Sequence, residues 1–291
     1  MKRKILILGA NGMLGHTIFF KLSNSSDLDV YGTIRNNQYL RWFQDKSKIF
    51  TSFYADDKKV LSFILKNIEP EYVINCIGIN RQSESLKNPV LAMKVNSIFP
   101  HLVAEECEKV GSKFIHFSTD YVFNGKKGQY TEADTPNPED TYGRTKLLGE
   151  ISNRKSTLTI RCSILGHELE TRNSVVEWFL SQKGKVTGHK NYNLSGITTL
   201  EMANILDHYV IPSSLSGLLN VSSDPISKYD LLKRLSLIYR KDINIEADEH
   251  FNCNSTLDST LFNRLSGYLA PSWGTMLEDM YKDFKIRYKR K

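Results

Sequence analysis

Three side chains in the middle of the chain could together move a proton. Tyr142 and Lys146 are four residues apart, and Ser118-Thr119-Asp120 comes a short way before them. Residues four apart lie on one face of a helix with β-carbons about 5–6 Å apart, so Lys146 could place a cation beside the phenol. A cation favours the ionised phenol, which is otherwise a poor acid or base at neutral pH. The Thr119 hydroxyl could bind the group whose proton Tyr142 moves, although this spacing is also typical of a solvated helix face.

A glycine turn near the N-terminus has the context of a dinucleotide-binding site. The apolar run Lys4–Leu8 predicts a buried strand, and Thr17–Leu22 has the apolar spacing of a helix. Of the glycines between them, Gly9 would allow a tight turn, Gly12 a close approach to pyrophosphate, and Gly15 the packing of helix on sheet. The free N–H groups of the helix would face the phosphates. The predicted cofactor contacts of this turn are Gly9, Asn11, Gly12, Met13, Leu14 and Gly15.

Arg35 indicates which dinucleotide the turn would hold. Asp29–Thr33 predicts the second strand, and Arg35 follows its end. In nucleotide-binding folds the end of this strand contacts the adenosine ribose. An acid there suits a free 2′-hydroxyl, whereas an arginine suits a 2′-phosphate. NADPH is therefore the expected cofactor, with NADH as the alternative. Asp56 and Asp57 either cap a helix that runs to Asn67, or Asp56 hydrogen-bonds adenine.

The next strand and helix would bring more residues to the cofactor. Tyr72–Ile77 predicts an apolar strand ending at Gly78, where backbone could lie against the cofactor. Asn88-Pro89 is a helix start, with an N-cap and a proline at the first position, and the helix would stop at Gly111. Asparagine is a mediocre helix former, so Asn96 inside this helix would serve a water or a carbonyl at a local kink. The predicted cofactor contacts here are Cys76, Ile77, Gly78 and Asn96.

Strand and helix signals alternate from residue 4 to about 162. Lys113–Phe117 and Leu158–Arg161 are further buried strands, so Thr119 lies just beyond a strand end, where ligands bind in open α/β sheets. The alternation predicts an α/β fold, a Rossmann-type doubly wound parallel sheet with a smaller C-terminal substrate-binding α/β domain. We expect an NAD(P)-binding domain at 1–163, with a return segment near 195–220, and a lid domain mainly at 164–291. Helices are expected there at Val175–Leu180, Leu200–Val210, Lys228–Tyr239 and Met276–Phe284.

Composition narrows the classes of partner. The 291 residues are 40% hydrophobic and 24% charged, and no apolar run approaches the roughly 18–20 residues of a membrane span. The four scattered cysteines imply neither zinc nor disulfides, so a cytoplasmic protein without a metal site is expected. The net charge of +7 suggests an anionic ligand, although part of it lies in the tail 285–291. No basic stripe interleaved with aromatic residues indicates nucleic acid.

With these motifs together, the chain resembles the extended short-chain dehydrogenase/reductases, and within them the dTDP-4-dehydrorhamnose reductase branch. The resemblance spans most of the chain and is densest from 115 to 150. It rests on Gly9-x-x-Gly12-x-x-Gly15, Asn96 with Pro100, Phe117-Ser-Thr-Asp-Tyr-Val-Phe-Asn-Gly125, Gly128-x-Tyr130-x-Glu132, Pro136, Tyr142-Gly-Arg-Thr-Lys-Leu-Leu-Gly-Glu150, Gly196-Ile-Thr-Thr-Leu-Glu-Met-Ala203, and Ser255-Thr-Leu-Asp258 with Trp273.

The resemblance implies an NAD(P)-dependent oxidoreductase. Its catalytic residues would be Thr119, Tyr142 and Lys146, of which Tyr142 and Lys146 would also contact the cofactor. The nicotinamide would deliver hydride to the C4 ketone of a nucleotide-diphosphate-activated 4-keto-6-deoxy sugar, while Tyr142 protonates the alkoxide. Thr119 would orient the carbonyl, and the pathway would be deoxysugar synthesis for surface polysaccharide. The resembling motif also implies substrate contacts, at Asp120, Val122 and Phe123.

One segment departs from the branch and leaves alternatives open. Ile77-Gly-Ile-Asn-Arg81 stands where the branch has an alanine-rich strand end and a valine-aspartate pair, so the sugar need not be the rhamnose precursor. Arg81 and Lys185 could meet substrate phosphate, the alternative being surface or structural ion pairs. A nucleotide-sugar epimerase or C4 dehydrogenase of the same superfamily would use the same three catalytic residues. The fold also serves as a noncatalytic NAD(P)-binding regulatory subunit, as in the β subunit of methionine adenosyltransferase. The sequence leaves a homodimer open.

Overall fold

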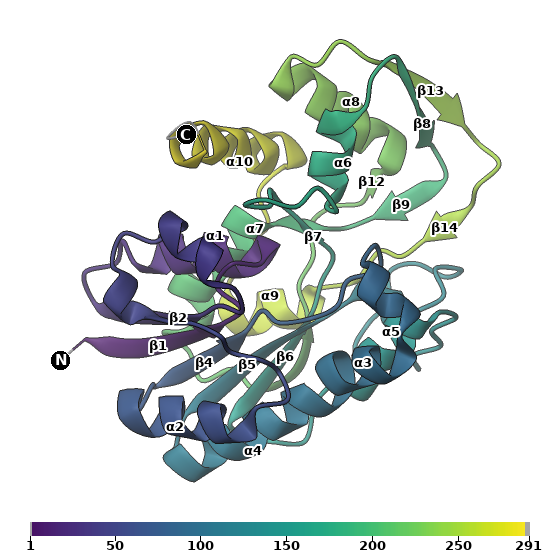
Figure 1. Ribbon diagram of the computed structural model, residues 1–291. Coiled ribbons are helices and arrows are strands. Elements are labelled where there is room, and N and C mark those ends of the chain that lie inside the picture. The colour runs from purple at the N-terminus through teal and green to yellow at the C-terminus, as the bar shows by residue number, and fades with distance from the viewer. Residues whose placement is uncertain (1, 289–291) are drawn as a thin grey trace.

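The computed structural model describes residues 2–288, so positions 289–291 of the basic tail lie outside the described residues. Its centre is a sheet of seven parallel strands (Figure 1). The strands are β1 (Arg3–Leu8), β2 (Leu28–Thr33), β3 (Ile49–Phe50), β4 (Tyr72–Asn75), β5 (Lys113–Ser118), β6 (Thr157–Arg161) and β11 (Gly217–Asn220). Their order, β3-β2-β1-β4-β5-β6-β11, reverses between β1 and β4, and ligands of doubly wound sheets bind at such a switch point.

Helices cover both faces of the sheet because β1 is apolar on both sides. Ile5 and Ile7 face one core with α1 (Met13–Leu22) and α7 (Thr199–Ile205), whereas Leu6 and Leu8 face a second core with α2 (Lys58–Ile68) and α4 (Phe99–Val110). Side chains alternate between the faces of a strand, so a fully apolar run requires cover on both. Figure 1 shows the two helical layers on opposite sides of the strands. The predicted Rossmann-type α/β fold is confirmed.

The helix expected from Asn88 to Gly111 forms in three pieces. Asn88 caps α3 (Pro89–Met93), a π-helical segment follows at Lys94–Ile98, and α4 ends at Gly111 in the left-handed conformation. A π segment adds a residue to a turn and often marks a functional site. The predicted kink therefore occurs at Asn96, which lies inside the π segment.

The C-terminal part contains the four helices that the sequence predicts. They are α6 (Val175–Ser181), α7 with its π-helical extension Leu206–Val210, α8 (Lys228–Tyr239) and α10 (Trp273–Arg287). It also contains α9 (Thr260–Ser266) and the short strands β7 (Ile164–Leu165), β8 (Lys185–His189), β9 (Tyr192–Leu194), β10 (Ile197–Thr198), β12 (Ile226–Ser227), β13 (Asn244–Asp248) and β14 (Cys253–Asn254). These strands were not predicted, because most have two or three residues and hydrophobic alternation needs about four to eight.

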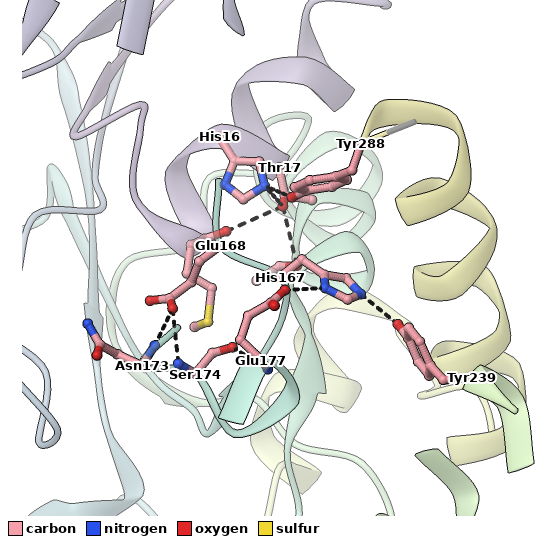
Figure 2. A network of polar contacts seen from close by, with 11 residues as sticks. His16, Thr17, His167, Glu168, Asn173, Ser174, Glu177, Tyr239 and Tyr288 are labelled. Atoms are coloured by element: carbon pink, nitrogen blue, oxygen red, sulfur yellow. Dashed lines mark hydrogen bonds and ion pairs between the residues drawn. The ribbon is translucent and has the colours of Figure 1, made fainter. Parts of the chain in front are cut away.

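Two buried histidines make polar contacts near the C-terminal helix, and one of them, His16, connects that helix to the glycine turn (Figure 2). His16 Nδ1 donates to the carbonyl of Gly12 at 2.7 Å, and its Nε2 accepts from the hydroxyl of Tyr288 at the end of α10. Burial lowers the pKa of His16 to about 4, which keeps the ring neutral and allows one nitrogen to accept. His167 bonds Glu177 and Tyr239 in the same way, each at 2.6 Å. The last turn of α10 is thereby fixed against the start of α1.

Gly15 makes the closest contact of the turn, so its replacement by alanine should destabilise the fold. A β-carbon on Gly15 would lie 2.1 Å from the carbonyl oxygen of Gly9, so Gly15→Ala must push α1 away from the turn. We expect a loss of about 1–3 kcal/mol in the free energy of unfolding, measured by urea denaturation. Gly274→Ala is the control, because a β-carbon there meets only side chains at 3.6 Å or beyond in α10 and should stabilise the helix by up to about 1 kcal/mol. Equal stabilities for the two variants would contradict the packing argument.

Candidate active site

A cavity of about 370 Å³ lies beside the glycine turn, at the carboxyl ends of β1, β2 and β4. Its walls bring together separate parts of the chain: the turn, the end of β2, the segment after β3, the segment after β4, and the start of the π-containing helix with Ser85 before it. The lining residues are Gly9, Asn11, Gly12, Thr33, Ile34, Arg35, Phe53, Tyr54, Ala55, Asp56, Cys76, Ile77, Gly78, Ile79, Ser85, Leu91, Lys94 and Val95.

The turn has the properties that a pyrophosphate requires. Gly9 has φ +79°, which a side chain would strain, and Gly12 occupies the N-cap of α1 without a side chain to block the helix end. The first turn of α1 carries no acidic residue, so its free N–H groups and the helix dipole favour an anion. A dinucleotide fits this cradle.

The predicted cofactor residues fall into two groups. Eight of them line the cavity, including exposed Arg35 and Asp56, while Asp57 caps α2 through the N–H of Val60. Six do not line it: Met13 and Leu14 begin α1, Gly15 packs under the turn, and Asn96, Tyr142 and Lys146 lie outside its lining.

Asn96 also lies behind the cavity wall instead of on it. Its fully buried side chain accepts from the N–H of Ile79 at 2.8 Å and donates to the carbonyl of the same residue at 3.0 Å. It also donates to the hydroxyl of Thr145 at 3.2 Å. The predicted carbonyl partner is therefore a protein group, and Asn96 ties the segment after β4 to the helix of Tyr142.

That helix, α5 (Thr141–Leu148), begins at Asp140, whose carboxylate accepts from the N–H of Gly143 at 2.8 Å. It lies very close to its neighbours, because a β-carbon on Gly143 would be 2.2 Å from the carbonyl of Tyr121, and one on Gly149 would be 2.0 Å from that of Asn96. Only glycine permits these approaches. They set the position of α5, which carries Tyr142 and Lys146.

Lys146 is held at the end of β5. Its buried ammonium donates to the carbonyl of Phe117 at 2.6 Å and lies about 4 Å from the position a β-carbon on Gly78 would take. Burial lowers the pKa of Lys146 to about 8, so the ammonium remains charged at neutral pH. A cation is therefore fixed between the cavity wall and the catalytic helix.

Tyr142 lies within hydrogen-bond reach of Thr119. Burial raises the pKa of Tyr142 above its ordinary value, and a hydrogen bond from Thr119 offsets part of that rise. Burial is the largest influence on this phenol, and it favours the protonated form. A protonated phenol is the form that donates a proton. Asp120 is an alternative acceptor for the same hydroxyl proton, 3.0 Å from the Thr119 oxygen, and both residues are buried.

A larger cavity of about 780 Å³ opens on the other side of these residues. Its volume is in the range of sites for small molecules. Arg81 lies on its wall, with its guanidinium 4.7 Å from the ring centre of Tyr121 and Nε bonded to Asp140 at 2.9 Å. The other lining residues are Phe123, Asn124, Gly125, Lys126, Glu139, Asn191, Tyr192, Asn193, Phe251, Asn252, Cys253, Asn254 and Ser255.

The predicted substrate residues are only partly brought together here. Arg81 and Phe123 line the large cavity, whereas Val122 is fully buried behind it and Asp120 is buried under Thr119. Lys185 lies elsewhere: it is exposed on β8, ion-paired with Glu246 at 3.2 Å, and lines a third cavity. No local sequence signal separated Lys185 from other surface lysines.

Several wall residues had no signal in the sequence. Tyr192 reaches the cavity from the C-terminal part, and its hydroxyl bonds that of Tyr121 at 2.7 Å. Arg161, at the end of β6, is buried in an ion pair with Glu150 at 2.7 Å and does not line the cavity. Within residues 2–288 no group of three or more metal-binding side chains gathers, and no helix is long and apolar enough to cross a membrane.

Comparisons with known proteins agree with this fold and its motifs. A crystal structure of dTDP-4-dehydrorhamnose reductase from Bacillus anthracis in complex with NADP superposes with a TM-score of 0.80, at 23% identity, over 97% of this chain and 100% of that one. Mouse methionine adenosyltransferase 2 subunit beta is 28% identical over 171 residues, 58% of this chain and 48% of that protein. Spore coat polysaccharide biosynthesis protein SpsK of Bacillus subtilis is 28% identical over 169 residues, 56% of this chain and 54% of that protein.

The names of the two curated relatives describe different roles, a subunit of an adenosyltransferase and a polysaccharide biosynthesis protein. The chain spans about half the length of the curated relatives it matches. The family assignment rests on a broader match. The model of the RmlD substrate binding domain matches residues 3–185, which is more than half of the chain. The protein therefore belongs to the RmlD substrate binding domain family, and so to the extended short-chain dehydrogenase/reductases that its motifs resemble.

Proposed function

We propose that this protein is an NADPH-dependent reductase of the C4 ketone of a nucleotide-diphosphate-activated 4-keto-6-deoxy sugar, serving surface polysaccharide or deoxysugar synthesis in the cytoplasm. One observation carries the proposal: Lys146, charged, lies against Gly78 of the cavity beside the glycine turn, and Tyr142, protonated and on the same helix, packs against Tyr121 of the larger cavity. A dinucleotide on one side and a sugar on the other would meet at this pair.

The chain's own residues would supply the proton and hold the carbonyl. NADPH, when bound, supplies the hydride. The Tyr142 hydroxyl would give its proton to the oxygen of the reduced ketone, since burial keeps the phenol protonated. Lys146 would stabilise the phenolate that remains, because its ammonium is charged below about pH 8 and fixed by Phe117. Thr119 would orient the carbonyl.

The protonation state of Asp120 would control which acceptor receives the hydrogen bond from the Thr119 hydroxyl. A hydroxyl has one proton, so Thr119 donates either to Asp120 or to Tyr142 and the substrate oxygen. Burial raises the pKa of Asp120 to about 6. When Asp120 is protonated it can donate to Thr119, and the Thr119 hydroxyl then becomes available to the reacting oxygen.

A noncatalytic role is the second candidate, favoured by the similarity to methionine adenosyltransferase 2 subunit beta. A regulatory subunit would bind the dinucleotide beside the glycine turn without turnover. An epimerase or C4 dehydrogenase with the same three catalytic residues would instead retain NAD through purification. Arg35 on the cavity wall supports NADPH over NAD.

Removal of the phenolic hydroxyl tests the reductase against the regulatory subunit. We expect purified protein to oxidise NADPH with at least one of a panel of dTDP-, UDP-, GDP- and CDP-linked 4-keto-6-deoxy sugars. Tyr142→Phe should lower kcat by about 10²–10⁴-fold and leave the NADPH Kd within about twofold, because proton transfer is lost while cofactor contacts remain. Tyr281→Phe, on α10, is the control. Absence of turnover with every sugar, despite tight NADPH binding, would support the regulatory subunit.

Reversal of the charge at Arg35 tests the cofactor choice. Arg35→Glu should reduce kcat/KM for NADPH relative to NADH by at least about tenfold, because a carboxylate repels a 2′-phosphate but accepts from a 2′-hydroxyl. Lys94→Gln removes a cation from the wall of the same cavity and should affect both cofactors alike. An unchanged NADPH/NADH ratio in Arg35→Glu would remove Arg35 from cofactor recognition.

The titration of Asp120 predicts a pH-dependent stability. Because its pKa is about 6 in the folded state and 3.8 ordinarily, the folded protein binds this proton more tightly, and stability falls as the pH rises from about 4 to about 6. Asp120→Asn removes this loss. Its free energy of unfolding relative to the parent should increase by about 2–3 kcal/mol between pH 4 and pH 7, measured in urea.

Exposed Asp45 provides a control of opposite sign. Hydrogen bonds from Ser47 lower the pKa of Asp45, so its ionised form stabilises the fold. Asp45→Asn should lose stability relative to the parent as the pH rises. If the relative stabilities of both variants move in the same direction with pH, the burial of Asp120 does not determine its titration.

A further inference from the structure

Lys228 has surroundings unlike those of the other lysines of the C-terminal part. It is the first residue of α8 and is only partly exposed. Its ammonium lies 5.4 Å from the ring centre of Trp178 and 5.8 Å from that of Tyr192. Lys228 and Trp178 line the third cavity, of about 370 Å³, whereas Tyr192 lines the large one. The ammonium thus lies at the boundary between the two cavities.

No carboxylate of residues 2–288 forms an ion pair with this ammonium. The neighbouring lysines differ: Lys185 pairs with Glu246 at 3.2 Å, and Lys190 pairs with Glu249 at 2.9 Å. Aromatic faces attract a cation but do not neutralise it, and half-burying an ammonium without an anion is costly. The position at the start of α8 adds to the cost, since a helix N-terminus disfavours a cation.

Arg81 places a second cation on the same boundary from the Rossmann side. Its guanidinium stacks on Tyr121, and the hydroxyls of Tyr121 and Tyr192 are bonded at 2.7 Å, so the two cations flank one tyrosine pair. They are close enough that Arg81, together with burial, lowers the pKa of Lys228. Asp140 pairs with Arg81, whereas no carboxylate in the described part of the chain pairs with Lys228.

We propose that Lys228 and Arg81 bind the diphosphate of the nucleotide-activated substrate, one cation from each side of the cleft, and that Lys228 is the binding residue from the C-terminal side. This inference rests on the proposed function. A diphosphate has enough charge and length to contact two cations, and Arg81 can bind its oxygens with two N–H groups at once. Because Tyr121 lies beside Tyr142, with ring centres 5.9 Å apart, a diphosphate held here would leave the attached sugar next to the proton donor.

Nucleoside diphosphates test this assignment without turnover. The affinities of the full-length protein for dTDP, UDP, GDP and CDP would be measured by calorimetry, and the tightest of them used as the probe. Lys228→Met should weaken that probe at least tenfold, leave the NADPH Kd within twofold, and flatten the salt dependence of binding. With keto-sugar substrate, KM should rise at least tenfold while kcat changes little, as expected for a contact made equally in ground and transition states.

Lys233→Met is the matched control, because Lys233 is exposed on the same helix and its ammonium also lies over a ring, 4.7 Å from the centre of Tyr229. It should bind the probe like the parent. Lys228→Arg should bind the probe with most of the parent's affinity, because it keeps the positive charge. If only the alkyl chain of Lys228 mattered, for a structural reason, the charge of the replacement would make no difference. If Lys228→Met folds and binds the probe as tightly as the parent, the assignment of Lys228 is wrong while the proposed function stands. If the parent binds none of the four diphosphates at millimolar concentration, the proposed nucleotide-sugar function itself is wrong.

Discussion

The bond from the Lys146 ammonium to the carbonyl of Phe117 is the constraint on which the site depends. A buried ammonium without such a partner would lose its proton or unfold its surroundings. The bond requires α5 to lie directly against the end of β5, and this approach is possible only because Gly143 and Gly149 present no side chain to the carbonyls of Tyr121 and Asn96. The spacing of Tyr142 and Lys146 on α5 can therefore bring the ammonium to β5 only in a helix whose glycines allow this close approach.

The same helix connects the two cavities. At its start, Asp140 caps α5 and holds Arg81 on the wall of the large cavity; further along, Thr145 holds Asn96 behind the cofactor cavity. A change in the position of α5 would alter both walls at once. Tyr142 lies between these two anchors along the helix, so contacts on both sides of it fix its backbone.

The sequence predicted well the parts of the fold and the candidate site that local pattern determines. Hydrophobic periodicity and capping predict the sheet strands with apolar runs, the irregularity at Asn96 and the bounds of α8. Lys185 and Lys228 show why the rest did not follow. Both are lysines at the start of an element, but β8 pairs with β13 and so meets Glu246, whereas α8 follows β12 and so meets Trp178 and Tyr192. Which partner each lysine has is decided by pairing between segments roughly 30–60 residues apart, which no local pattern records.

The two parts of the chain contribute different walls to the cavities. Tyr142, Lys146 and the glycine turn all lie in the sheet part, while Tyr192 and Lys228 line cavities from the C-terminal part. The bonds of His16 to Gly12 and to Tyr288 fix α10 against the turn, so the C-terminal part is braced at the glycine turn. Substitutions of its residues on the large cavity can then alter that wall without moving α5.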